Sequence, residues 1–173
     1  MSKMHQMQLT YVPEEDRMLF RLNTQGGEEF RFWMTRRYLG LLFQTLAKLV
    51  RDLEQTKSEA HAGMAVEPLA VESRHREQVG KADFETAYEE SAQLPLGAEP
   101  VLLHRAAVRP GTMGQALLGM HPRQGQGIEI TLNEKILHSL CKLLADTSKQ
   151  AGWRLDLELV NPGPGANEQA SWN

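Results

Sequence analysis

The stretch FWMTRRYLGLLFQTL, Phe32–Leu46, decides the fold, because it changes from a strand pattern to a helix pattern within a few residues. Its first residues alternate in polarity, and Thr35 is a residue type that caps helices. After Thr35, apolar residues recur at the three- and four-residue spacing of a buried helix face. About a hundred residues later, ITLNEKILHSLCKLL, Ile130–Leu144, repeats this order. The sequence therefore predicts two strand-to-helix units of the same kind.

Two further alternating stretches precede the first unit. They cover Met7–Val12 and Arg17–Asn23, and the adjacent glycines in TQGGE are typical of a hairpin turn before Glu29–Met34. Residues 1–57 are thus expected to form a β-β-β-α module.

The second unit has a similar environment. Strand patterns precede a helix that is capped by Asn133 and stopped by Gly152, and an alternating stretch follows it. Residues 98–160 are therefore expected to form a β-β-β-α-β module, and residues 161–173 a flexible tail. The expected strands are Val101–Val108, Gly114–Met120, Ile128–Leu132 and Trp153–Val160.

The predicted fold class is α+β, with two β-β-β-α-like modules packed as one unit and an additional C-terminal strand. Aligning Thr35 with Asn133 brings the strand, cap and helix positions into register without a gap. A module of about 50 residues buries little apolar surface alone, so two modules would close one core. An internal duplication is the preferred interpretation, and a coincidence of ordinary α+β patterns is the alternative.

The middle of the chain differs from both modules. Residues 58–100 carry a net charge of −6, whereas the flanking parts carry +2 and +1. Residues 58–97 lack a sustained apolar stripe, and Pro68 and Gly80 interrupt them. We predict an acidic linker with short helical pieces around Asp83–Ala92. It could be a solvated connector, fold back over a basic sheet face, or dock a protein partner.

Bulk composition restricts the compartment. The chain of 173 residues has one cysteine, so an intrachain disulfide is excluded. No run reaches the ~18 apolar residues that a membrane span requires, and the first twelve residues lack a signal-peptide pattern. These features predict a cytoplasmic protein that does not bind membranes.

Arginines beside a tryptophan form the leading candidate site. If the apolar residues of the N-terminal strands face the helix, Arg17, Arg21, Arg31 and Trp33 share the opposite face. Guanidinium groups neutralise phosphates and an indole stacks on a base, so this face suits single-stranded nucleic acid. Arg36 and Arg37 follow at the helix start, where the helix dipole disfavours cations. The second module has Glu129 and Thr131 at the matching positions.

The rival hypothesis is a protein interface. The same face could be buried against the second module, with its arginines paired to Glu14, Glu15 or Glu28, or it could serve an assembly or adaptor protein. An exposed sheet edge would also allow a homodimer. At the level of topology alone, the arrangement resembles the whirly group of single-strand nucleic-acid binders, although three strands rather than four precede each helix.

No catalytic or metal motif stands out. His138 and Cys141 have an H-x-x-C spacing, but a second ligand pair is missing, so a solvated histidine and a packed cysteine are expected. The glycines of PRQGQGIEI precede a strand rather than a helix and so do not predict a phosphate loop. We expect a non-catalytic binding protein with no cofactor.

Overall fold

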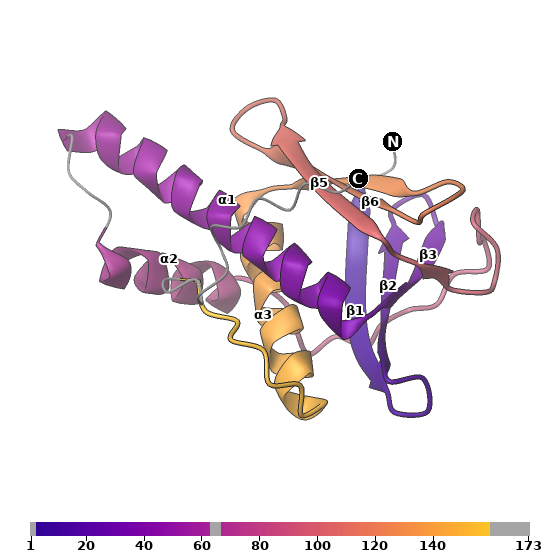
Figure 1. The fold of residues 1–173 in the computed structure, drawn as a ribbon. Coiled ribbons are helices and arrows are strands. Elements are labelled where there is room, and N and C mark those ends of the chain that lie inside the picture. Colours follow the sequence, from indigo (N-terminus) through magenta and orange to yellow (C-terminus); the bar gives the residue numbers. More distant parts are fainter. Residues whose placement is uncertain (1–2, 63–66, 160–173) are drawn as a thin grey trace.

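Two three-stranded antiparallel meanders, each followed by a helix, form the framework of the structure, a computed structural model that describes residues 3–62 and 67–159 (Figure 1). The first sheet has the order β1-β2-β3-β4, with β4 parallel to β3, and the second has the order β5-β6-β7. The fold class is therefore α+β, as predicted. The described elements are β1 (Met4–Val12), β2 (Arg17–Thr24), β3 (Glu29–Met34), α1 (Arg36–Ala62), α2 (Pro68–Gly80), β4 (Val101–Leu102), β5 (Arg105–Pro110), β6 (Ala116–His121), β7 (Ile128–Leu132) and α3 (Glu134–Gln150).

Alternation along the strands separates an inner from an outer face. Phe20 of β2 lies opposite Phe32 of β3, and both are fully buried. Leu118 of β6 lies opposite Ile130 of β7 and is buried in the same core. Burying a side chain of this size stabilises the fold by about 1.5–3 kcal/mol, so these inward rows fix the register of each sheet.

Polar caps begin both long helices at the predicted positions. The Thr35 hydroxyl accepts a hydrogen bond from the Tyr38 backbone N–H (3.2 Å), and the Asn133 side chain accepts one from Ile136 (2.8 Å). Each cap satisfies a backbone donor that has no partner within the helix. Gly152, with a φ of 68°, ends α3 as predicted.

Each long helix contacts a strand of the other half. The nearest strand to α1 is β5 of the second sheet, whereas α3 approaches β1 of the first (Figure 1). Leu42 of α1 and Leu140 of α3 are fully buried in one core that draws on both sheets. Neither half therefore buries its apolar face with its own residues alone.

The two halves correspond closely in register. The pair Phe20–Phe32 matches the pair Leu118–Ile130, with each residue 98 positions later, and the two caps are separated by the same interval. The match between β1 and β5 requires one residue fewer in the second half, because Leu9 pairs with Phe20, whereas Val108 pairs with Leu118. This correspondence is what a duplication would produce, but the internal duplication itself stays a prediction.

The acidic linker contains a helix where none was predicted. The prediction placed helical pieces around Asp83–Ala92, but that stretch is irregular, and α2 lies earlier. Pro68 and Gly80, interpreted as interruptions, are its first and last residues. Proline is well tolerated in the first helical turn because its missing N–H has no partner there.

Two other predicted strands differ in the structure. Val101–Val108 is divided, because Leu103 is buried and donates its N–H to Trp33 (2.9 Å), after which the chain moves from the first sheet to the second. Residues 153–159 form no strand and pair with neither sheet, and the Leu155 N–H donates to the Trp153 carbonyl (2.9 Å). Their leucines point inward along α1, where Arg51 donates to the Leu159 carbonyl (2.9 Å). Val160 and the predicted tail lie outside the described residues, and no described helix is long and apolar enough to cross a membrane.

Candidate interface on the outer face of the N-terminal sheet

A row of apolar side chains crosses the outer face of the first sheet. In register, Leu19 lies beside Trp33, and Trp33 lies beside Leu102. We call these three residues the apolar row. Leu19 and Trp33 are half-buried and Leu102 is 44% exposed, and none of the three belongs to the core or packs against it. The structure thus directs Trp33 to the outer face, as the alternation predicted, where it lies beside Leu102 of the second module.

The adjacent row contains Arg21, which is held by the chain itself. Its guanidinium donates to Gln8 (3.0 Å) and pairs with Glu90 (2.6 Å). It also lies 4.8 Å from the centre of the Tyr88 ring, a cation–π distance. The side chain is only 19% exposed, so a phosphate would have to displace these partners.

Arg31, the neighbour of Arg21 in this row, is also paired. It donates to the carboxylate of Glu29 (2.7 Å), which is buried and also accepts the Ser91 N–H (2.8 Å). Burial raises the pKa of Glu29, but these two donors outweigh it and hold the pKa below its usual value. The carboxylate therefore stays charged and neutralises Arg31.

Residues 87–99, which we call the strap, cover this part of the sheet. Gln6 donates to the Ala87 carbonyl (3.0 Å), Asn23 to the Glu89 carbonyl (2.8 Å) and the Glu29 N–H to the Gln93 carbonyl (2.8 Å). The acidic linker thus folds back over the arginine row, one of the alternatives that the charge pattern suggested. The apolar row lies beyond these contacts.

The other three predicted arginines lie near the start of α1 and the β1–β2 turn. Arg17 is within 3.8 Å of Glu15, a long and solvent-exposed pair. Arg36 is exposed and donates to the Arg154 carbonyl (3.3 Å), and Arg37 is exposed on the next residue. Sequence reasoning therefore placed Arg17, Arg21, Arg31 and Trp33 on one face correctly. Of the partners it named, Glu15 does pair with Arg17, whereas Arg21 and Arg31 pair with Glu90 and Glu29, which it did not name.

Arginines do not outnumber carboxylates around the apolar row. Five predicted arginines lie near it, and the β1–β2 turn, β3 and the strap contribute seven carboxylates. Among the carboxylates of the turn, Asp16 accepts two side-chain hydrogen bonds, from Trp153 (3.1 Å) and Tyr11 (2.9 Å). Both bonds lower its pKa. A surface without an excess of positive charge attracts a polyanion weakly. The seven carboxylates belong to Glu14, Glu15, Asp16, Glu29, Glu89, Glu90 and Glu99.

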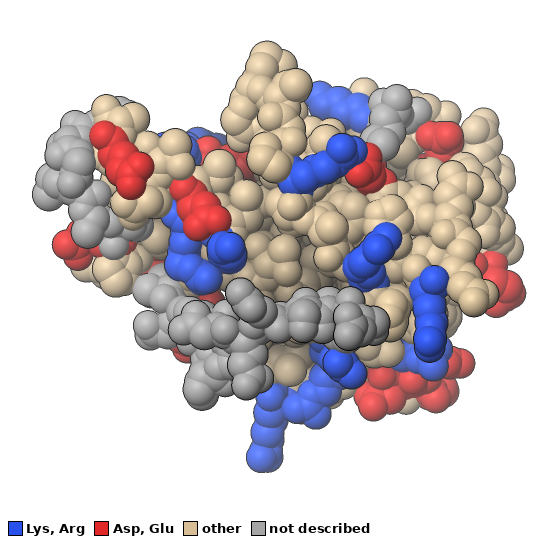
Figure 2. Space-filling model, turned by 45° about the horizontal axis from the view of Figure 1, so that its top comes forward, with Lys and Arg blue, Asp and Glu red and all other residues tan. Residues whose placement is uncertain are grey.

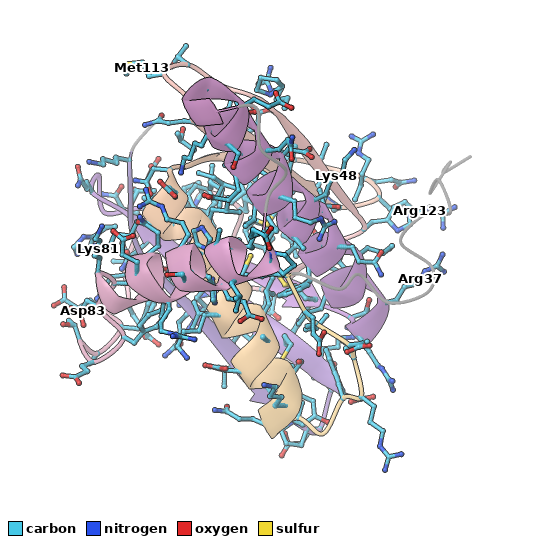
Figure 3. The ribbon with its side chains drawn as sticks, turned by 90° about the vertical axis from the view of Figure 1, so that its left-hand side faces the viewer. Arg37, Lys48, Lys81, Asp83, Met113 and Arg123 are labelled. Carbon is cyan, nitrogen blue, oxygen red and sulfur yellow. The ribbon has the colours of Figure 1, made fainter. Side chains whose placement is uncertain are left out.

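A second group of cations shares Arg37 with the five predicted arginines. Figure 2 shows several Lys and Arg side chains spread over one face of the molecule. In Figure 3, Arg37 and Lys48 of α1 and Arg123 of the β6–β7 loop extend toward one side, whereas Lys81 and Asp83 lie on the opposite side. All three cations are exposed. Only Arg37 of this group was predicted as a binding residue.

An open cleft of about 820 Å³ separates β7 from the end of the first sheet. Met4 and Phe30 line one wall, and Ile128 and Ile130 line the other. Its lining contains neither serine nor cysteine among the described residues, and Glu28 is bound to Thr24 (3.2 Å). The lining also includes His121 and Glu129, so the cleft combines apolar contact with titratable side chains.

The H-x-x-C pair behaves differently from its prediction. Cys141 is packed in the core as expected, and burial raises the pKa of its thiol to about 12. His138, expected to be solvated, is buried and contacts His75 of α2. That prediction was wrong because α2 was not recognised, although Val71, His75 and Gln78 have the spacing of one helix face. The described residues contain no group of three metal-ligating side chains that could hold an ion.

Comparison with known proteins gives no match: no family model, no curated protein and no solved structure resembles this chain detectably. The interface must therefore be interpreted from its own geometry.

Proposed function

We propose that this chain is a non-catalytic assembly protein that binds a protein surface, a second copy of itself in the first instance, through the outer face of its N-terminal sheet. The observation that carries the proposal is the apolar row, which places Trp33 between two leucines on a face that the core does not use. Tryptophan, tyrosine and arginine dominate the energetics of protein interfaces, and a neutral polar rim around an apolar centre is their usual anatomy.

The charge pairs favour a protein over a nucleic acid at this face. Arg21 and Arg31 already have carboxylate partners at 2.6 and 2.7 Å. A phosphate would compete with these anions, whereas a protein surface can pack on the apolar row without breaking them. The strap is compatible with a protein partner here. Its hydrogen bonds go to Asn23 and Glu29 and not to the apolar row.

Self-association tests the proposal. Sedimentation velocity over a range of protein concentrations should show an association that persists at high salt, because apolar contacts are not screened. Leu102→Glu should abolish it by placing a charge at the exposed end of the row. Leu69→Glu is the matched control, since Leu69 is 76% exposed on α2, away from the row.

If the chain remains monomeric at every concentration, a second copy is not the partner. A photo-crosslinking residue at position 102 should then join the chain to another protein in cells, whereas one at position 69 should not. No adduct specific to position 102 would overturn the proposal.

Single-stranded nucleic acid is a second candidate, which the basic surface of Arg37, Lys48 and Arg123 favours. Anisotropy of a labelled single strand should then show binding that weakens steeply with salt. Lys48→Glu should reduce it, and Lys81→Glu, on the opposite side, should not. Loss with Trp33→Ala and Arg31→Glu instead would place nucleic acid on the sheet face and contradict the assembly proposal.

A further inference from the structure

Two imidazoles meet where α2 packs against α3. The Nδ1 atoms of His75 and His138 are 2.9 Å apart, and the ring centres are 5.1 Å apart. His138 is 1% exposed and His75 is half-buried. At this distance one Nδ1 must donate a proton to the lone pair of the other.

Polar contacts contribute much of the packing of α2 against α3. Besides the imidazole pair, Arg74 donates to both carboxylate oxygens of Glu134 on α3 (2.5 and 2.9 Å). Val71 is the only large apolar side chain of α2 that is buried, and Leu69 at its start is exposed. An element with so little apolar burial is among the first to open locally.

The shared hydrogen bond sets a limit on the protons that the pair can bind. A single added proton can be accommodated on an outer Nε2 atom, and the Nδ1–H···Nδ1 bond remains. A second added proton places an N–H on both Nδ1 atoms, so two donors and two positive charges face each other. The docked pair therefore binds fewer protons than two separate imidazoles, which are free to bind one each.

We propose that the His75–His138 pair makes the docking of α2 on α3 pH-dependent, with α2 docked at neutral pH and released as both imidazoles become protonated. This inference is independent of which ligand the sheet face binds.

The surrounding charges act in the same direction on balance. Burial and His75 lower the pKa of His138 to about 4, although Glu134 opposes them, and Lys57 of α1 and Arg74 of α2 add to the lowering. Burial and then Lys142 of α3 lower the pKa of His75, against a smaller opposing effect of Asp146. In the released state both imidazoles return toward their ordinary pKa of about 6.5.

The sign of the effect follows from proton linkage. Between about pH 6.5 and 4 the released state binds more protons than the docked state, so docking weakens as the pH falls, by up to about tenfold per pH unit for each proton. The neighbouring ion pair responds only at the low end of this window, because the pKa of Glu134 is held at about 2 by Arg74 and Lys57 and returns toward 4.5 only when α2 is released. A release that begins between pH 6.5 and about 5 therefore reports the imidazoles and not the carboxylate.

Hydrogen exchange measured by mass spectrometry tests the proposal. Amide exchange of residues 68–80 is followed from pH 7.5 to 4.5 and corrected for intrinsic rates, with residues 17–24 of β2 as the internal reference. We expect the opening of α2 to increase at least about tenfold over this range, while β2 stays protected. The His75→Gln/His138→Gln double variant should lose the pH dependence, and His5→Gln, which changes an exposed histidine on β1, should behave as the wild type.

Two results would overturn the proposal: exchange of α2 that does not depend on pH, or a double variant with the wild-type dependence. If the double variant is open at every pH, NMR titration of the two wild-type imidazoles decides. Both should titrate below 6.5, and an ordinary value for both would contradict the shared hydrogen bond.

Discussion

At the scale of single residues, the hydroxyl of Tyr38 forms no hydrogen bond with the described residues. Tyr38 is buried at the start of α1, and burial raises its pKa. A buried unsatisfied hydroxyl destabilises a fold, so Tyr38→Phe should leave the free energy of unfolding unchanged or raise it by about 1 kcal/mol. Urea denaturation measures this difference, and a clear loss of stability would show that the hydroxyl has a partner.

Glu29 is the opposite case, a buried carboxylate with two donors. Glu29→Gln removes the charge that neutralises Arg31 and should lower the free energy of unfolding by about 1–3 kcal/mol at pH 7. Because the pKa of Glu29 is lowered by folding, its contribution is present above the unfolded pKa and is lost as the pH falls through the folded value. The wild type and variant should therefore converge in acid.

Denaturation at pH 7 and pH 3 checks that convergence. Glu15→Gln is the matched control, since Glu15 is exposed and its pair with Arg17 is long. Equal stabilities of Glu29→Gln and wild type at pH 7 would show that the buried ion pair contributes nothing.

Alternation in the sequence was sufficient to place Arg21, Arg31 and Trp33 on the outer face. It also held a clue that went unused, because Glu29 precedes Arg31 by two residues and therefore shares its face. The pairing of Arg21 with Glu90 could not be predicted, since it depends on how a linker without a regular pattern returns to the sheet.

At the scale of elements, capping explains why the long helices were predictable and α2 was not. Both α1 and α3 begin with a side-chain cap and bury a continuous apolar stripe, whereas Glu67 before α2 makes no cap hydrogen bond. Residues 153–159 show the reverse error. Their alternation correctly predicts which side chains face inward, but a sheet also needs a partner edge, and that depends on tertiary structure.

The cap of α3 gives a prediction at this scale. Asn133→Ala removes the acceptor for the Ile136 N–H (2.8 Å) and should lower the free energy of unfolding by about 0.5–2 kcal/mol. Asn133→Asp keeps the acceptor and should retain most of the stability. Thermal or urea denaturation measures both, and equal losses in the two variants would contradict a capping role.

At the scale of the whole molecule, the repeated strand-to-helix pattern predicted the order of the elements along the chain. It did not predict that each helix would pack against a strand of the other half. A sequence pattern indicates which face of a helix is buried, but it does not indicate which sheet covers that face. The structure places α1 near β5 and α3 near β1, so each module completes the apolar environment of the other. This exchange explains why two short modules can share one core.

A shared core predicts that the two halves unfold together. Leu42 and Leu140 occupy matching positions 98 residues apart, and both are fully buried. Leu42→Ala and Leu140→Ala should each lower the free energy of unfolding by about 2–5 kcal/mol. In both variants, Trp33 fluorescence and Trp153 fluorescence, each isolated by replacing the other tryptophans with phenylalanine, should report one midpoint. If Leu140→Ala instead separated an early Trp153 transition from a later Trp33 transition, the halves would be independent folding units, and the exchange of helices would not couple them.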